Sequence, residues 1–308
     1  MDFEELLAAY LSWDHETVMA TFEMPGSWPP PPPPATTPAR RLRDVTGPIG
    51  EHAIWSAHTN QVLAKLGLAY VPAYLWGRAV GLGDPSSATV AAAFAIYDPR
   101  LVAAVYEHAR RQCGRAGFVA TRDEATIASL SDVLGDADVA SAVAVLRRGL
   151  DAADGSGRML FAGLRSLDWP DSPLGQLWRA CALVREHRGD SHMAVWVAAG
   201  FGPVAINLLT ELWFGMPLGV YTALRRGWSE EAIGAAVAEL ERRGLVAGGE
   251  ITPAGRQLRD ELEDRTDALE QPIVDAMGDD FEPVTRALDG WSAAVVATGA
   301  FPPGAYAG

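Results

Sequence analysis

The chain is poor in cysteine: its 308 residues include only Cys113 and Cys181, and each lies in a segment of helical periodicity. Two cysteines in such positions do not form a disulfide framework, so we expect free thiols in a reducing, cytoplasmic setting. The residues after Met1 do not join a basic segment to a long apolar stretch, so no signal peptide is expected either.

Long apolar runs and strand-like patterns are also missing. The longest apolar run, residues 193–209, contains Gly200, Gly202 and Pro203 and is too short to cross a bilayer comfortably. Segments that alternate Val, Ile or Thr with polar residues are nearly absent, which argues against an extensive sheet. We therefore expect a mainly α-helical protein with no membrane partner.

Basic residues are scarce, because 25 Lys and Arg stand against 39 Asp and Glu and the net charge is −14. Since proteins usually gain affinity for nucleic acids by neutralising phosphates, this balance disfavours DNA as the main partner.

The sequence also lacks the patterns of cofactor and metal sites. It has no phosphate-binding Gly-rich loop. His187 and His192 point roughly 140° apart on a helix, whereas a zinc site needs both on one face. We expect neither a cofactor nor a metal.

Residues 1–46 form a distinct amino-terminal arm. Residues 1–24 have the pattern of one amphipathic helix, and residues 25–38, with a run of six prolines, predict an extended polyproline II spacer. The arm could dock on its own chain, on a second protomer or on another partner, with Trp13 and Trp28 as anchors. A loosely packed extension is the alternative.

Helical periodicity fills the rest of the chain, which we divide into an N-terminal helical domain, residues 47–172, and a C-terminal part, residues 173–308. The C-terminal part begins with a central helix and continues with the order of helices and short hairpin that is typical of a winged helix. Its wing would be a minimal β-hairpin at residues 244–252. Segments 240–246 and 251–256 resemble the recognition helix, wing and following helix of multiple-antibiotic-resistance-type regulators.

The central helix contains an octet of mostly polar residues, Arg185-Glu186-His187-Arg188-Gly189-Asp190-Ser191-His192, within an apolar run from Leu174 to Ala199. An unpaired buried ion costs on the order of several kcal/mol, so both arginines need carboxylate partners, either Glu186 and Asp190 or acids elsewhere. Gly189 indicates a close backbone approach, a kink, or space for a ligand. The octet is therefore either an active site or a buried salt-bridge network that clamps two halves of the chain together, with Arg265 and Asp267 as further candidate members.

Several motifs together resemble an actinobacterial helix-turn-helix family that has no settled biochemical role. They are Tyr74–Ala79, Val90–Phe94, Asp98–Val102, the octet with its Arg-Glu-His-Arg-Gly-Asp-x-His pattern, Arg226–Trp228 and Arg265–Asp267. The likeness spans residues 50–305, and the arm is not part of it. The resemblance implies a winged-helix-containing fold and no particular reaction.

The recognition helix of the predicted winged helix is a poor DNA reader. It begins with Ser229, Glu230 and Glu231, and two carboxylates there would face phosphate. The tip of the wing, residues 248–250, has no basic side chain. If the domain does bind DNA, its best phosphate contacts are Arg225, Arg226, Arg242 and Arg243.

The octet also has the composition of an acid-base site. We predict His192 as the base or acid, Asp190 as its orienting partner, and Glu186 and His187 as further catalytic candidates. Arg185 or Arg188 would stabilise an anion, and both share a helix face with Trp178. The other substrate-binding candidates are Trp196, Tyr74 and Arg78, although helix packing is the favoured explanation for the last two.

The leading hypothesis is a protein of two helical domains that binds a hydrophobic small molecule at the domain junction, with the octet as the polar end of the site. We favour a cofactor-independent acid-base enzyme, such as a cyclase, isomerase or hydrolase that acts on a secondary metabolite. The alternative is a ligand-responsive winged-helix regulator, dimeric through its terminal helices. A third hypothesis is a non-catalytic interaction protein that acts through its arm.

Overall fold

The computed structural model describes residues 2–23, 29, 36–302 and 305–306. Over these residues the regular secondary structure is helical except for one two-stranded antiparallel sheet, which confirms the mainly α fold with a minimal hairpin. The first half contains α1 (Phe3–Ser12), α2 (His15–Thr21), α3 (Pro38–Gly50), α4 (His52–Trp55), α5 (Ala57–Ala64), α6 (Tyr70–Ala79), η1 (Val80–Leu82), α7 (Ser87–Ala93), α8 (Pro99–Gln112), α9 (Arg115–Leu134) and α10 (Ala140–Asp151). The second half contains α11 (Met159–Arg165), α12 (Pro173–Ala198), α13 (Pro203–Trp213), α14 (Val220–Arg226), α15 (Glu230–Arg242), β1 (Val246–Ala247), β2 (Glu250–Ile251), α16 (Pro253–Met277), η2 (Gly278–Asp280) and α17 (Phe281–Val296).

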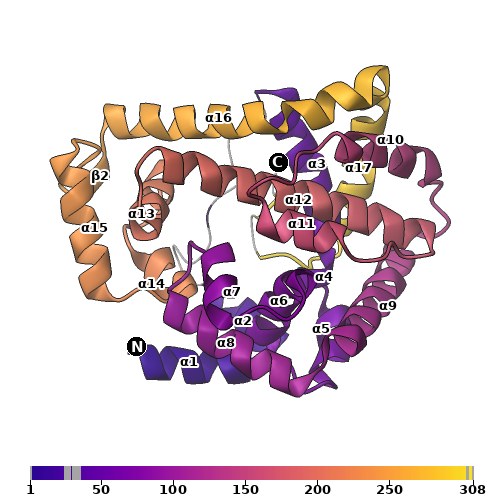
Figure 1. Ribbon diagram of the computed structural model, residues 1–308, viewed down its shortest axis with the longest axis horizontal. Helices are drawn as coiled ribbons and strands as arrows, with labels where there is room; N and C mark the ends of the chain where they lie inside the picture. Colours follow the sequence, from indigo (N-terminus) through magenta and orange to yellow (C-terminus); the bar gives the residue numbers. More distant parts are fainter. Residues whose placement is uncertain (1, 24–28, 30–35, 303–304, 307–308) are drawn as a thin grey trace.

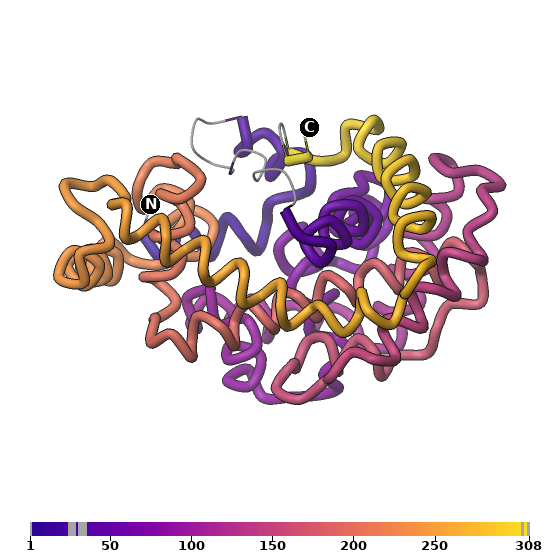
Figure 2. Tube along the Cα trace, turned by 90° about the horizontal axis from the view of Figure 1, so that it is seen from above, coloured from indigo at the N-terminus to yellow at the C-terminus, as the bar shows by residue number. Residues whose placement is uncertain are grey.

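Two long helices, α12 and α16, lie side by side and antiparallel, and they extend between the α13–α15 end of the molecule and the end with α10 and α17 (Figures 1 and 2). Each begins at a capped end, because the hydroxyls of Ser172 and Thr252 accept hydrogen bonds from backbone N–H groups three residues later. Both helices contribute to two hydrophobic cores, α12 through Leu177 and Trp196 and α16 through Ile273 and Leu262. They therefore tie the two ends of the molecule together.

One end of the molecule is a winged-helix lobe, which we define as α13, α14, α15, the β1–β2 hairpin and the first turns of α16. The hairpin pairs Val246 with Ile251, and its turn contains Gly248 and Gly249 with φ values of 58° and 82°. Leu208, Leu240 and Leu262 lie in the core of the lobe. The predicted order of three helices, a hairpin and a long helix is present.

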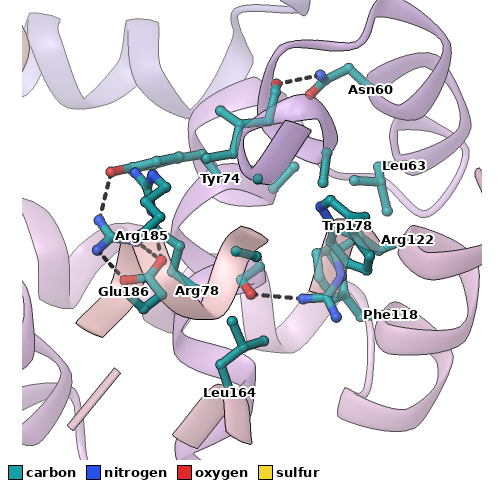
Figure 3. Close-up of a pocket in the computed structure, with 16 residues that line it drawn as sticks. Asn60, Leu63, Tyr74, Arg78, Phe118, Arg122, Leu164, Trp178, Arg185 and Glu186 are labelled. Carbon is teal, nitrogen blue, oxygen red and sulfur yellow. Dashed lines mark hydrogen bonds and ion pairs between the residues drawn. The ribbon is translucent and has the colours of Figure 1, made fainter. Parts of the chain in front are cut away.

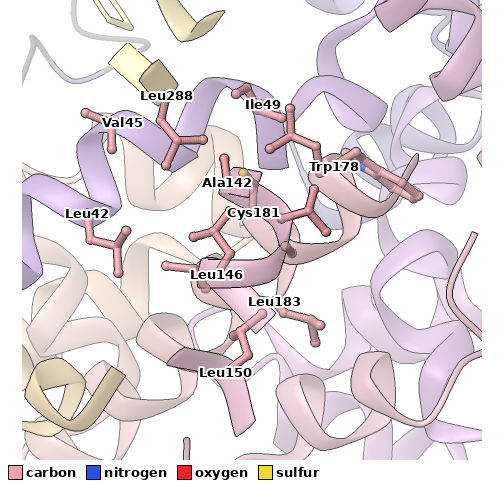
Figure 4. Packing of buried hydrophobic residues seen from close by; sticks show 14 of the residues in the cluster. Leu42, Val45, Ile49, Ala142, Leu146, Leu150, Trp178, Cys181, Leu183 and Leu288 are labelled. Atoms are coloured by element: carbon pink, nitrogen blue, oxygen red, sulfur yellow. The ribbon is translucent and has the colours of Figure 1, made fainter. Parts of the chain in front are cut away.

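The remaining helices form a larger body around two cores. In one of them, α3 packs between α12 and α17 and meets Leu146 of α10 and Cys181 of α12 (Figure 4). A Cβ at Gly50 would lie 2.9 Å from the backbone of Cys181, so glycine is required where α3 crosses α12. Residues 38–46, which we expected to belong to the arm, instead form most of α3, since Thr37 caps this helix through its side chain.

The helical part of the amino-terminal arm packs against its own chain and is not a loose extension. Its predicted single helix is wrong: Trp13 is extended and Asp14 caps a second helix, so α1 and α2 are separate. Tyr10 is buried and its hydroxyl donates to the carbonyl of Leu224 in the lobe, while α1 packs against α6 and α8 of the body. Trp28 and most of the proline-rich spacer lie outside the described residues.

Within the described residues, no single helix is long and apolar enough to cross a membrane. The pair α12 and α13 passes that test by length and composition together, but the two helices are bent by 109°.

Candidate functional site

A cavity of about 1040 Å³ lies between the body and the winged-helix lobe. Its lining comes from α3, α6 and α17 of the body, from α13 and α14 of the lobe, and from the two long helices. The octet supplies Arg185, Arg188, Gly189 and His192, and Trp196 follows one turn later. A Cβ at Gly189 would meet no atom within 4 Å, so of the three expected reasons for this glycine the structure favours open space.

Four side chains on α6 and α12 form what we term the Tyr74 cluster: Tyr74, Arg78, Arg185 and Glu186 (Figure 3). Arg78 donates to both oxygens of Glu186 at 2.9 and 2.7 Å, and to the hydroxyl of Tyr74 at 2.8 Å. Arg185 donates to Glu186 at 2.7 Å and to Glu51 at 2.9 Å. All four also line a small neighbouring cavity of about 50 Å³, together with Trp178.

The charges of this cluster change the acidity of Tyr74. Burial opposes ionisation of the phenol, but the positive charges of Arg78, Arg185 and Arg226 lower its pKa to about 8. Its hydrogen-bonding partner Tyr97, at 3.0 Å, has a pKa well above the ordinary value because it is buried. Tyr74 is thus a proton donor or acceptor at the cavity that can exchange a proton near neutral pH.

A second group, which we term the clamp cluster, joins α12 to α16. It consists of Arg188, Arg259, Glu263 and Asp267. Arg188 donates to Glu263 at 2.7 Å and to Asp267 at 2.6 Å, and Arg259 pairs with Glu263 at 2.7 Å. Arg40 adds a pair with Asp267 at 2.9 Å. The expected network therefore exists and includes Asp267, whereas Arg265 is exposed.

His192 lies beside the clamp cluster. Its Nδ1 is 3.2 Å from the hydroxyl of Thr266 and 4.0 Å from Glu263. Burial and the positive charges of Arg259 and Arg188 lower its pKa to about 4, although Glu263 opposes this. His192 is therefore a neutral imidazole at pH 7.

Two of the predicted catalytic residues lie away from the cavity, on the other side of α12. His187 is buried against Glu270 at 2.8 Å. Asp190 accepts a hydrogen bond from the N–H of Phe161 at 3.0 Å, and burial raises its pKa to about 6. The expected contact of Asp190 with His192 is not formed, because residues two apart on a helix point about 160° away from each other.

The structure thus separates the predicted site residues into groups. Those on the large cavity are Tyr74, Arg78, Arg185, Arg188, His192 and Trp196. Glu186 and Trp178 line the small cavity, and His187 and Asp190 line neither. Arg226, which also lines the large cavity, was predicted only as a phosphate contact. In the sequence, Arg226 was marked by its place in the Arg226–Trp228 motif.

The outer surface of the lobe is poorly suited to phosphate. Glu230 and Glu231 are exposed at the start of α15, as expected. Arg225, in contrast, is directed inward, since it donates to the hydroxyl of Thr21 in the arm at 2.8 Å. Only Arg242 and Arg243, of the four predicted phosphate contacts, are exposed.

In the described part of the chain, no group of three or more His, Cys, Asp or Glu side chains could hold a metal ion. Comparison with known proteins found no significant match among curated proteins or among solved structures. The profile of a helix-turn-helix family matches residues 39–302.

Proposed function

The chain belongs to the helix-turn-helix family, and from this premise and the position of the cavity we propose that it is a ligand-responsive regulator of winged-helix type. The observation that carries the proposal is the origin of the cavity lining. Tyr74 and Arg78 come from the body, whereas Phe214 and Arg226 come from the lobe. A molecule bound there touches both parts, so its binding energy can select one orientation of the lobe over another.

The cavity suits a hydrophobic small molecule with a polar end. Its volume lies at the upper end of the range of roughly 300–1,000 Å³ that is usual for ligand pockets. Trp196, Phe214 and Met216 supply apolar and aromatic surface. The Tyr74 cluster supplies hydrogen-bonding groups on another side, so such a ligand is oriented by its polar end.

The output of this regulator is DNA binding through α15, weakened by the charge of the lobe. Arg242, Arg243 and Arg256 are its exposed basic groups near the recognition helix and wing. With about three phosphate contacts, the logarithm of the affinity falls with the logarithm of the salt concentration with a slope of about −3.

The test selects duplexes from a random DNA pool at about 50 mM salt, with and without a metabolite extract of the organism that encodes the protein. We expect an enriched sequence whose binding changes when the extract is present. An R242A/R243A variant should lose this binding, while R110A, in which an arginine on α8 of the body is removed, should retain it. Absence of any selected sequence at low salt would refute the regulator.

The second candidate remains an acid-base enzyme, and one observation favours it: Tyr74 has a pKa of about 8 and lines the cavity beside Arg78 and Arg185. In this mechanism Tyr74 donates or accepts the proton, and the arginines stabilise an anionic intermediate of the substrate. It predicts that the extract contains a compound that wild type converts and that Y74F does not. Conversion by Y74F at the wild-type rate would remove this candidate.

A further inference from the structure

Arg226 differs from the other arginines that line the large cavity. Among the described lining residues there are six arginines, and five of them form ion pairs: Arg43, Arg78, Arg185, Arg188 and Arg259. No carboxylate of the described residues lies within ion-pair distance of the Arg226 guanidinium. A guanidinium in a partly enclosed site without a counterion carries an uncompensated charge, which is costly unless an anion is supplied.

The contacts of Arg226 hold it in place without neutralising it. One Nη donates to the hydroxyl of Tyr221 at 2.9 Å, and the guanidinium lies 4.3 Å from the ring centroid of Tyr97. Its Nε has no hydrogen-bond partner in the described structure. Glu211 lines the same cavity and its charge interacts with that of Arg226, but its oxygens accept hydrogen bonds from Gly219 and Thr222 and form no ion pair with Arg226. The positioned guanidinium therefore still has the capacity to bind an anion.

Arg226 also lies where the lobe is fastened to the body. It is the last residue of α14, and its carbonyl accepts from the N–H of Asp98 at 2.8 Å. The indole of Trp228 donates to the carbonyl of Ile96 at 3.0 Å, and the amide of Asn207 donates to the same oxygen at 2.8 Å. An anion at Arg226 is therefore held at the junction itself.

We propose that Arg226 binds the acidic group of the ligand, and that the ligand is an aromatic or polycyclic monoanion such as a carboxylic acid. This inference rests on the proposed small-molecule function of the cavity and adds the class of the ligand. A single uncompensated guanidinium matches a single negative charge, whereas a phosphate ester carries about two near pH 7. Trp196 and Phe214 provide the aromatic surface for the rest of the molecule.

The test uses 2-naphthoate and 2-naphthamide, which share one ring system and differ in charge. Calorimetric titration of the full chain should show that wild type prefers the naphthoate by about tenfold or more. R226Q should abolish this preference while leaving the affinity for the naphthamide unchanged, and R226K should keep part of it. R110Q, which removes an arginine outside the cavity, should behave as wild type.

The outcomes separate this inference from the proposed function. If wild type binds both probes equally, or R226Q keeps the preference, the anion assignment is overturned and the small-molecule site stands. If wild type binds neither probe, both are overturned. Should R226Q fail to fold, a crystal structure of wild type with 6-bromo-2-naphthoate decides: a carboxylate within hydrogen-bond distance of Arg226 supports the inference, and one at another residue overturns it.

Discussion

The Tyr74 cluster and the clamp cluster both border the same cavity and share α12, yet the groups beside their arginines differ. In the clamp cluster two arginines face two carboxylates, and Arg40 adds a further pair with Asp267. In the Tyr74 cluster Arg78 and Arg185 share Glu186, and Arg185 also pairs with Glu51 outside the cluster. The phenol of Tyr74 lies beside these arginines, and the positive charges of Arg78, Arg185 and Arg226 lower its pKa. Arginines that face only carboxylates form a structural joint, whereas arginines beside a phenol produce a group that can exchange a proton.

The largest expected effect comes from breaking the clamp cluster. In R188M the buried Glu263 keeps only Arg259 and the buried Asp267 keeps only Arg40. We therefore expect a loss of about 3 kcal/mol in the free energy of unfolding. Urea denaturation of wild type and R188M measures this. R185M should cost less, since Glu186 retains Arg78 in its bidentate pair. Equal losses in the two variants would contradict the distinction between the clusters.

Asp190, an octet residue that belongs to neither cluster, gives the next largest effect. Burial raises the pKa of Asp190 from 3.8 to about 6, so the folded state binds a proton that the unfolded state has already released. Wild type should therefore lose stability as the pH rises from about 4 to 6, by about 2 kcal/mol, and D190N should not. At pH 7 D190N should be the more stable protein, and below about pH 4 this advantage should vanish. If the free energies of unfolding of wild type and D190N changed in parallel between pH 3 and 8, the raised pKa of Asp190 would be refuted.

A smaller effect is expected in the Tyr74 cluster. Because its pKa is about 8, Tyr74 should produce a step in the ultraviolet absorbance of tyrosinate well below the titration of the other tyrosines. Y74F should remove this step and lower the free energy of unfolding by about 1 kcal/mol, since hydrogen bonds to Arg78 and Tyr97 are lost. Y106F, a change outside the cluster, should retain the step.

The smallest effect is expected at an exposed pair on the lobe. Arg243 pairs with Glu239 at 3.4 Å on the surface of α15. R243A should change the free energy of unfolding by less than about 1 kcal/mol, because water already solvates both charges. A loss as large as that of R188M would mean that burial is not what distinguishes the clamp cluster.

Much of the fold was readable in the sequence because it depends on local patterns. The capped starts of α12 and α16 and the Gly248–Gly249 turn are each set by neighbouring residues. The prediction for the arm was wrong at two capping residues. Asp14 begins a second helix within the segment predicted as one helix, and Thr37 begins a helix at the end of the segment predicted as extended.

The candidate site was only partly predictable. The need for buried arginines to be paired followed from the octet alone, but Glu263, Asp267 and Glu270 lie more than 70 residues later, and only tertiary packing brings them close. Asp190 and His192 are two residues apart, so helix geometry already argued against their pairing. Arg226 could not be distinguished from Arg225 without the structure, since the two point to different neighbours.

The most direct test of the cavity as a ligand site uses native mass spectrometry of the full chain after incubation with a metabolite extract. G189F places a side chain in the open space of the cavity, and G290F places the same side chain at an exposed position of α17 with no atom within 4 Å of its Cβ. We predict that wild type and G290F retain the same small molecule and that G189F does not. Retention by G189F at the wild-type level, or by none of the three proteins, would contradict the account.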